Sequence, residues 1–331
     1  MKNNKVLVTG ANGFVGTALL EKLVEETDCK IIAMHRNKLT SEIEKRFASL
    51  VQWVQADITT EDLSKAVADV QTVFHLAAHS SMSETSAERN LMEQVNVLGT
   101  KRLAVACKEA GVQHFIYVSS IAACESGSLL LIDESNGFPV SSYGKSKRDA
   151  EDLLLKLCGN GFEVTVLRST VLFGENHLGS IYELVKTISL GRFVIFGKGN
   201  NYTNFYYIRD FIHVLLAIKN NAKSHGQVFI AADRAYQLND VVTCITQALE
   251  YRRSIFKIPV LLGYILATMC DIVTKLSGKE MPLSKKRYKA MTRNITYSNS
   301  KLTKVLNISP MYGLLEGIHN TVKWYRDTGL I

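Results

Sequence analysis

The chain has 331 residues, of which 47% are hydrophobic and 21% are charged, a balance typical of soluble globular proteins. The net charge of +8 favours anionic ligands, but no cluster of Lys and Arg alternates with aromatic residues, so nucleic acid is not expected as a partner. The six cysteines are scattered without a CxxC pair, so we expect no metal site, no disulfide framework and a cytoplasmic protein with reduced thiols.

The first predicted elements are a strand from Val6, a glycine-rich loop, and a helix that follows it up to Val24. Gly10 allows a tight turn after the strand, Gly13 allows a pyrophosphate to approach the backbone, and Gly16 allows the helix to pack closely on the strand. The free amide groups at the helix N-terminus favour phosphate there. We therefore interpret this segment as a dinucleotide site, with a purely structural turn as the alternative.

The end of the second predicted strand bears on the choice of dinucleotide. An acidic residue at this place binds the ribose 2′-hydroxyl of NAD, whereas an arginine accommodates the 2′-phosphate of NADP. The sequence has no carboxylate between Met34 and Lys38, and Arg36 lies among them. We expect NADP as the cofactor, with NAD not excluded.

Strand and helix patterns alternate up to about residue 172. Strands are predicted at Lys30–His35, Val51–Gln55, Thr72–Ala77, His114–Ser119 and Glu163–Arg168, and helices at Leu63–Ala68, Met92–Ala110 and Lys147–Cys158. This alternation predicts an α/β fold with a doubly wound parallel sheet. We expect residues 1–172, with parts of 205–232, to form a dinucleotide-binding domain, and residues 173–204 and 233–331 to form a smaller substrate lobe.

A hydroxyl group and a Tyr–Lys pair follow the fifth predicted strand. Ser120 comes at the carboxyl end of that strand, where ligands bind in open α/β sheets. Tyr143 and Lys147 are four residues apart, so both lie on one face of a helix that Ser141 or Ser142 caps. A neighbouring ammonium favours the phenolate, which predicts that Tyr143 acts as a general acid/base.

Two later segments are open to two interpretations each. The apolar run 258–270 has 13 residues, short of the roughly 20 that span a bilayer, so we expect a buried helix, with a weak membrane-surface contact as the alternative. The basic run 284–289 is expected to form a solvated helix face, with contacts to a substrate diphosphate as the alternative.

Several short motifs, taken in their order, resemble one family. They are Thr9–Gly16, Ala56-Asp57, His75–Ala78, Asn96–Thr100, Tyr117–Ser120, Tyr143–Lys147 and Leu167–Ser169. The chain resembles the extended short-chain dehydrogenases/reductases, in their epimerase/dehydratase branch. The resemblance implies a Rossmann-type domain, an enzyme that transfers a hydride to or from a nicotinamide cofactor, and a homodimer.

The resemblance also implies a role for each matching residue. Tyr143 would be the general acid/base, Lys147 would lower its pKa and hold the nicotinamide ribose, and Ser120 would orient the reacting oxygen. Asn96 would lie on the helix beneath the active site. The cofactor would be bound by Thr9, Gly10, Asn12, Gly13, Phe14, Val15, Gly16, Arg36, Asp57, Ile58, Leu76, Ala77, Ala78, Ser119, Tyr143, Lys147 and Ser169.

The substrate class stays open between three hypotheses. The leading one is a nucleotide- or lipid-activated sugar that undergoes 4-keto reduction or 4-epimerisation for surface polysaccharide. Val171 and Thr203 stand where nucleotide-sugar members often carry an Asn and an Arg, which favours an alternative, a hydrophobic hydroxy/keto compound of steroid or flavonoid type. A catalytically idle nucleotide sensor is the third, and the presence of Ser120, Tyr143 and Lys147 speaks against it.

Overall fold

The computed structural model describes residues 4–25, 29–81, 83–125, 131–279, 281 and 283–331. The chain forms two compact units. The larger unit comprises Met1–Leu172, Ile208–Ala232 and Ser298–Met311, and the smaller unit comprises Phe173–Tyr207, Asp233–Tyr297 and Tyr312–Ile331.

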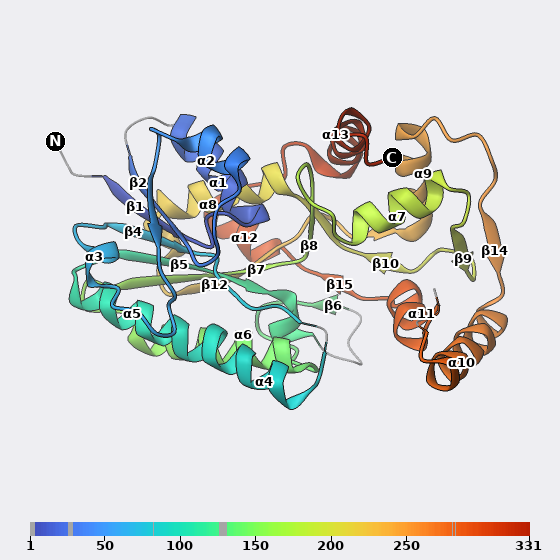
Figure 1. The fold of residues 1–331 in the computed structure, drawn as a ribbon, viewed down its shortest axis with the longest axis horizontal. Helices are drawn as coiled ribbons and strands as arrows, with labels where there is room; N and C mark the ends of the chain where they lie inside the picture. The colour runs from blue at the N-terminus through green and yellow to red at the C-terminus, as the bar shows by residue number, and fades with distance from the viewer. Residues whose placement is uncertain (1–3, 26–28, 82, 126–130, 280, 282) are drawn as a thin grey trace. The chain divides into compact units, whose positions relative to one another are not determined.

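The larger unit is built on one sheet of seven strands, all parallel, in the order β12-β7-β5-β4-β1-β2-β3. Figure 1 shows α5 and α6 along one face of this sheet and α1 and α8 along the other. Because helices cover both faces, most residues of the central strands are apolar and buried. The predicted doubly wound parallel sheet is confirmed. The strands are β1 (Lys5–Thr9), β2 (Lys30–His35), β3 (Gln52–Gln55), β4 (Thr72–His75), β5 (His114–Ser120), β7 (Glu163–Ser169) and β12 (Gln227–Ala231).

One helix of this unit is longer than expected, and it changes from α-helical to π-helical and back along its length. The prediction for this helix began at Met92, but the helix starts at Ser86, where the Thr85 side chain caps it, and contains a π-helical stretch at Glu93–Gly99 between α4 and α5. The helices are α1 (Phe14–Glu25), α2 (Ser41–Phe47), α3 (Ser64–Val67), α4 (Ser86–Met92), α5 (Thr100–Glu109), α6 (Ser142–Leu157), α8 (Ile208–Lys219) and α12 (Ser300–Leu306), with β6 (Leu131–Ile132) and β8 (Val171–Phe173) as short strands.

The segment 298–311 differs from the expected domain division, which placed it in the smaller lobe. It belongs to the larger unit because polar contacts hold it to the last sheet strand and to α8. The Lys301 ammonium donates to the Val228 carbonyl (2.9 Å) and the Asn299 amide donates to the Ala232 carbonyl (2.8 Å). The Met311 amide donates to the Asp210 carboxylate (2.6 Å).

The smaller unit combines helices with short strand pairs. In its core α13 packs against α9 and β11, where Gly317 lies against the rings of Tyr207 and Phe173. Its elements are α7 (Ser180–Ser189), β9 (Val194–Phe196), β10 (Tyr202–Thr203), β11 (Phe205–Tyr207), β13 (Tyr236–Gln237), α9 (Leu238–Ala248), β14 (Phe256–Ile258), α10 (Val260–Ser277), α11 (Lys285–Thr292), β15 (Thr296–Tyr297) and α13 (Gly313–Asp327).

Helix α10 corrects the prediction of a buried helix at residues 258–270. It runs from Val260 to Ser277, and only Gly263 and Ala267 are fully buried. The other side of the helix exposes large apolar side chains. Among the described residues, α10 is the one helix that is long and apolar enough to cross a membrane, judged by length and composition alone. An apolar sequence predicts that something covers the helix, but it does not say what.

Candidate active site

The glycine loop connects β1 to α1 at the carboxyl end of β1, which lies between β4 and β2 in the sheet. Gly10 has φ +65°, and a Cβ there would lie 2.9 Å from the Ala77 backbone nitrogen, so a side chain would collide with the end of β4. A Cβ on Gly16 would overlap the Gly10 carbonyl oxygen. Gly13 is exposed, and Phe14 and Val15 begin α1 with half-buried side chains. The first turn of α1 therefore lies beside this open loop, as a phosphate site requires.

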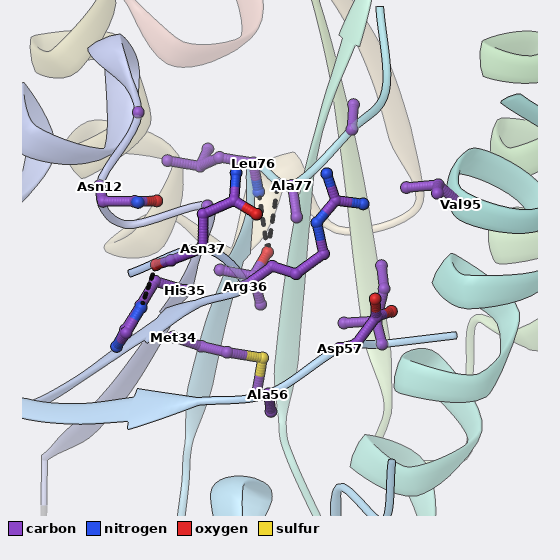
Figure 2. Close-up of a pocket in the computed structure, with 15 residues that line it drawn as sticks. Asn12, Met34, His35, Arg36, Asn37, Ala56, Asp57, Leu76, Ala77 and Val95 are labelled. Atoms are coloured by element: carbon purple, nitrogen blue, oxygen red, sulfur yellow. Dashed lines mark hydrogen bonds between the residues drawn. The ribbon is translucent and has the colours of Figure 1, made fainter. Parts of the chain in front are cut away.

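A pocket of about 240 Å³ opens at this loop. Figure 2 shows side chains from the ends of β1 and β2 and from the segments after β3 and β4 around it. Ten of the residues predicted to bind the cofactor line the pocket: Thr9, Gly10, Asn12, Gly13, Arg36, Asp57, Ile58, Leu76, Ala77 and Ala78. It is also lined by residues that were not among those predicted to bind the cofactor, namely Met34, His35, Asn37, Ala56 and Val95. A dinucleotide fits this donor set, because backbone amides, a cation and an acid converge on one open cavity.

Asp57 and Arg36 bring opposite charges to this pocket. The Asp57 carboxylate accepts hydrogen bonds from the Thr59 hydroxyl (2.6 Å) and the Thr59 amide (2.8 Å). The hydroxyl bond is the largest influence on the pKa of Asp57, which lies below its ordinary value, and the Arg36 charge lowers it further. Asp57 is therefore ionised at neutral pH, and Figure 2 shows the Arg36 side chain extending beside the pocket.

Tyr143 stands in the first turn of α6, close to the carboxyl end of β5. The Ser141 hydroxyl caps this helix by accepting from the Gly144 amide (3.0 Å). The side chains of Ser120, a predicted site residue, and of Ser80, which the sequence did not single out, lie close enough to the Tyr143 hydroxyl to affect its pKa. Burial raises the pKa of Tyr143 above its ordinary value, while the two serine side chains oppose that rise.

Lys147 lies one turn after Tyr143 and is buried. Its ammonium donates to the Val118 carbonyl (2.8 Å) and lies 4.2 Å from the centre of the Tyr117 ring. Burial lowers the pKa of Lys147 to about 7, although the Glu151 carboxylate acts in the opposite direction. Burial dominates the pKa of Tyr143, which is raised, so the lowering expected from Lys147 stays a prediction.

Ser119 and Ser169, the two serines predicted to bind the cofactor, lie on the neighbouring strands β5 and β7. Ser120 of β5 stands opposite Ser169 of β7 in the parallel register, and the Ser169 hydroxyl donates to the Ser119 carbonyl (3.2 Å). The Ser119 side-chain oxygen and the Tyr117 hydroxyl are buried and have no hydrogen-bond partner among the described residues. The Tyr117 ring lies against the Lys147 ammonium, so one of these unpaired groups borders Lys147.

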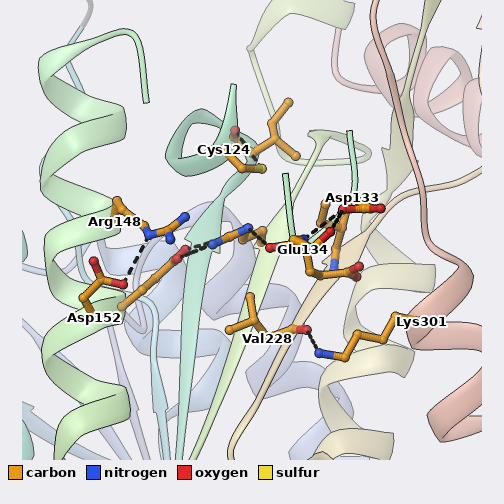
Figure 3. A network of polar contacts seen from close by, with 12 residues as sticks. Cys124, Asp133, Glu134, Arg148, Asp152, Val228 and Lys301 are labelled. Carbon is orange, nitrogen blue, oxygen red and sulfur yellow. Dashed lines mark hydrogen bonds and ion pairs between the residues drawn. The ribbon is translucent and has the colours of Figure 1, made fainter. Parts of the chain in front are cut away.

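An ion pair that the sequence did not predict fixes the next turns of α6. The Arg168 guanidinium of β7 contacts the Glu151 carboxylate at 2.7 Å, and both side chains are buried. Arg168 also donates to the Glu134 carbonyl (3.4 Å), and the Glu134 carboxylate accepts from the Ile230 amide (2.9 Å; Figure 3). Glu151 lies two turns from Tyr143 on the same helix, so this pair holds the helix that carries Tyr143 against the sheet.

Asn96 does not line the pocket but connects three elements beneath the site. From the π-helical stretch its amide donates to the His79 carbonyl (2.9 Å) and to the Ser146 hydroxyl (2.9 Å). Its carbonyl oxygen accepts from the His79 amide (2.7 Å). The next residue is Ser80, whose side chain affects the pKa of Tyr143, so Asn96 holds the backbone that carries this serine.

His75 is a second buried group that joins the strands at the site. The Thr9 hydroxyl accepts from the Leu76 and Ala77 amides (both 3.2 Å), so its hydrogen points to His75 Nδ1 (2.7 Å). His75 Nε2 then donates to the Thr100 hydroxyl (2.9 Å). Burial lowers the pKa of His75 to about 3, so the ring is neutral. These contacts give His75 a structural role between β1, β4 and α5.

Comparison with known proteins agrees with this geometry. A family model described as the NAD dependent epimerase/dehydratase family matches residues 6–232. The N-acetyl-alpha-D-glucosaminyl-diphospho-ditrans,octacis-undecaprenol 4-epimerase of Escherichia coli O157:H7 is 28% identical over 97% of this chain and 95% of its own length. The 3beta-hydroxysteroid-dehydrogenase/decarboxylase isoform 1 of Arabidopsis thaliana is 29% identical over 96% of this chain and 78% of its own length.

A solved structure shows the same fold. The UDP-glucuronic acid 4-epimerase from Bacillus cereus, in complex with NAD, superposes with a TM-score of 0.77 at 21% identity, over 98% of this chain and 99% of that chain.

Proposed function

Because the chain belongs to the NAD dependent epimerase/dehydratase family, we propose that it acts on a sugar joined through a diphosphate to a nucleotide or a lipid. The reaction would be 4-epimerisation or 4-keto reduction, at a carbon that alternates between carbinol and carbonyl. The family and the relatives identify the chain as an extended short-chain dehydrogenase/reductase enzyme, so the idle-sensor hypothesis is set aside.

One observation carries the chemistry: Ser120, at the carboxyl end of β5, lies close enough to the Tyr143 hydroxyl to lower its pKa. Tyr143 would give a proton to a carbonyl oxygen, or remove one from a carbinol, while Ser120 holds that oxygen. Lys147 would stabilise the phenolate that is left when Tyr143 gives its proton to the carbonyl oxygen, and that takes the carbinol proton in the opposite direction, because its ammonium lies one helical turn away. When bound, the nicotinamide accepts or supplies the hydride.

For the cofactor we propose NADP over NAD. The support is Arg36, which lines the pocket at the end of β2, where no carboxylate is present between Met34 and Lys38. We expect Arg36→Ala to weaken NADPH about 10-fold or more and to leave NADH nearly unchanged, because a bond to a charged group is worth about 1.5–3 kcal/mol. Fluorescence titration with both nucleotides measures this. Wild-type protein that binds NADH more tightly than NADPH would contradict the proposal.

The sugar hypothesis is supported by the relatives' names. One relative is named as a 4-epimerase of a lipid-diphosphate sugar, and another, from Vibrio cholerae, as a UDP-glucose 4-epimerase at 26% identity over 96% of this chain. The alternative is a hydroxysteroid-like substrate, which the Arabidopsis relative supports. Val171 and Thr203, where an Asn and an Arg often hold the diphosphate, also favour the alternative.

A substrate panel separates these proposals. Purified protein is incubated with UDP-N-acetylglucosamine, undecaprenyl-diphospho-N-acetylglucosamine or a 3-hydroxysterol, and absorbance at 340 nm and sugar products are followed. An epimerase forms the C4 epimer without net change in NAD(P)H, whereas a reductase or dehydrogenase changes absorbance in proportion to product. Turnover of the sterol alone would overturn the sugar proposal.

Two further proposals concern the state of the protein. From the sequence we propose a cytoplasmic homodimer. Light scattering of the purified chain tests the dimer, and fractionation of cells that produce the chain tests the compartment. A monomeric mass, or a protein found outside the cytoplasm, would contradict them.

A further inference from the structure

Helix α10 is apolar on two opposite sides, and the protein covers one of them. Gly263 and Ala267 pack into a small cluster with Phe196 and Tyr288. On the opposite side a stripe of large apolar residues faces solvent, with Leu261 71%, Met269 57% and Leu276 84% exposed. This apolar stripe consists of Leu261, Leu262, Ile265, Met269, Ile272, Val273 and Leu276. A contiguous surface of this kind is typical of a protein or membrane contact.

Positive charge surrounds the apolar stripe. Residues 256–293 contain eight Lys or Arg and two Asp or Glu, which gives this segment a net charge of +6 out of the chain's +8. Several of these cations are exposed on α11, which packs beside α10, and at the end of α10 (Figure 1). This basic border comprises Lys275, Lys279, Lys285, Lys286, Arg287 and Lys289.

We propose that α10 docks the protein on the surface of a bilayer that contains anionic phospholipids. The apolar stripe lies at the boundary between headgroups and acyl chains, and the basic border lies among the phosphates. Apolar burial and charge attraction then act on the same face. The proposal does not depend on the substrate, although it would bring the enzyme to a surface where lipid-linked substrates reside.

Contacts along α10 favour a helix that lies on the membrane over one that crosses it. The Tyr288 hydroxyl donates to the Val260 carbonyl at the start of α10 (2.9 Å). In the second half of α10, Asp271 accepts from the Lys285 amide (3.2 Å) and Thr274 accepts from the Met281 amide (3.2 Å). A spanning helix would have to break these bonds and bury Asp271 in lipid. At about 1.5 Å per residue, 18 residues reach roughly 27 Å, slightly less than the hydrocarbon core.

The charge distribution also argues against a second copy of the chain as the partner that covers the apolar stripe. A two-fold pair through the apolar stripe would bring two segments of net charge +6 together, because such interfaces pair the same patch with itself. An anionic lipid surface instead neutralises the border.

Co-sedimentation of the full chain with vesicles tests the proposal. Vesicles of phosphatidylcholine alone are compared with vesicles that contain three parts in ten of phosphatidylglycerol. We expect binding to the anionic vesicles that falls as sodium chloride increases, because the charge attraction is screened. We expect weak binding to the neutral vesicles. Inorganic diphosphate at equal ionic strength should release no more protein than sodium chloride does.

Matched variants separate the two contributions. Leu261→Glu/Met269→Glu/Leu276→Glu should abolish vesicle binding, whereas Leu50→Glu/Leu178→Glu/Leu190→Glu changes the net charge equally at exposed leucines elsewhere and should not. Lys275→Gln/Lys279→Gln/Lys289→Gln should reduce the partition coefficient more than 10-fold, since each basic residue near an anionic surface contributes about 5-fold. Lys65→Gln/Lys101→Gln/Lys156→Gln is its control. Thermal unfolding confirms that all four variants fold.

Three outcomes would overturn the proposal. The first is wild-type protein that stays in solution with both vesicle types. If Leu261→Glu/Met269→Glu/Leu276→Glu then changed a dimer into a monomer, a second copy of the chain would be what covers the apolar stripe. The second is equal loss of binding in a variant and its control. The third is protein that resists extraction by alkaline carbonate, which would identify a spanning helix.

Discussion

Helices α6 and α10 place their side chains in opposite ways. Helix α6 buries charged residues, Lys147 and Glu151, against the sheet, whereas α10 exposes large apolar residues to solvent. Each arrangement costs free energy unless a partner compensates, because charges are disfavoured inside and large apolar surfaces are disfavoured outside. In α6 the partners are within the protein. In α10 they have to come from outside, so the same kind of exception indicates catalysis in one helix and docking in the other.

The largest effect is expected at the start of α6. Tyr143→Phe removes the proton donor without changing the ring, so kcat should fall about 10²–10⁴-fold while nucleotide affinity stays near the wild-type value. Steady-state kinetics with the substrate that the panel identifies, together with nucleotide titration, measure both. Tyr251→Phe in the smaller unit is the control and should behave as wild type. Unchanged turnover in Tyr143→Phe would remove α6 from the chemistry.

A buried and an exposed ion pair on α6 should differ strongly in their effect on stability. Arg168→Met leaves the Glu151 carboxylate buried without its partner, which should lower the free energy of unfolding by about 3–5 kcal/mol. Arg148→Met breaks the exposed pair with Asp152 (3.2 Å) and should change the free energy of unfolding by less than about 1 kcal/mol.

Urea denaturation of both variants measures this difference. The double variant Arg168→Met/Glu151→Leu should regain part of the loss, because no unpaired charge then remains. Equal effects of Arg168→Met and Arg148→Met would show that burial does not distinguish the two pairs.

The pH dependence of stability reports on the buried Lys147. Its pKa is about 7 in the folded protein, against an ordinary value of 10.5, so between these pH values the unfolded chain binds the extra proton. The contribution of Lys147 therefore makes stability rise with pH from about 7 to 10.5, by at most about 1.4 kcal/mol per pH unit.

Lys147→Met should lose this slope, and Lys156→Met, exposed on the same helix, should keep it. Denaturation of all three proteins at pH 7 and pH 9 gives the comparison. If wild type and Lys147→Met gained the same free energy of unfolding between pH 7 and pH 9, this would contradict a lowered pKa for Lys147.

The smallest effect is expected on α10 in solution. Leu276→Ser removes a side chain that is 84% exposed, so the free energy of unfolding should change by less than about 0.5 kcal/mol. Ala267→Ser, on the covered side of the same helix, should cost about 1 kcal/mol or more, since it places a hydroxyl in an apolar cluster. Thermal unfolding without lipid measures both. A large loss with Leu276→Ser would mean that the protein itself covers the apolar stripe.

The sequence predicted features that depend on local patterns. The parallel sheet followed from the alternation of strand and helix, and the glycine loop followed from the spacing of Gly10, Gly13 and Gly16. The start of α6 was recognisable from its capping serines. Each of these signals lies within about ten neighbouring residues, where hydrophobic period and turn chemistry decide the structure.

Other features required the fold. Arg168 and Glu151 are 17 positions apart, and Ser80 is 63 positions from Tyr143, so no local pattern indicates that they meet. The exposure of α10 was missed for a different reason. Composition shows that a helix avoids water, but the covered side depends on residues such as Phe196, which are distant in the sequence.

The π-helical stretch Glu93–Gly99 makes this part of the chain sensitive to length. A wide turn holds more residues than an α-helical turn, so deleting one residue here would restore a regular helix. The wide turn absorbs the extra residue, so α5 would keep nearly the same rotation relative to α4 and its buried face would stay covered. The loss would fall on the stretch itself, where Asn96 contacts His79 and Ser146. A series of single-residue deletions along this helix would locate the part that tolerates them.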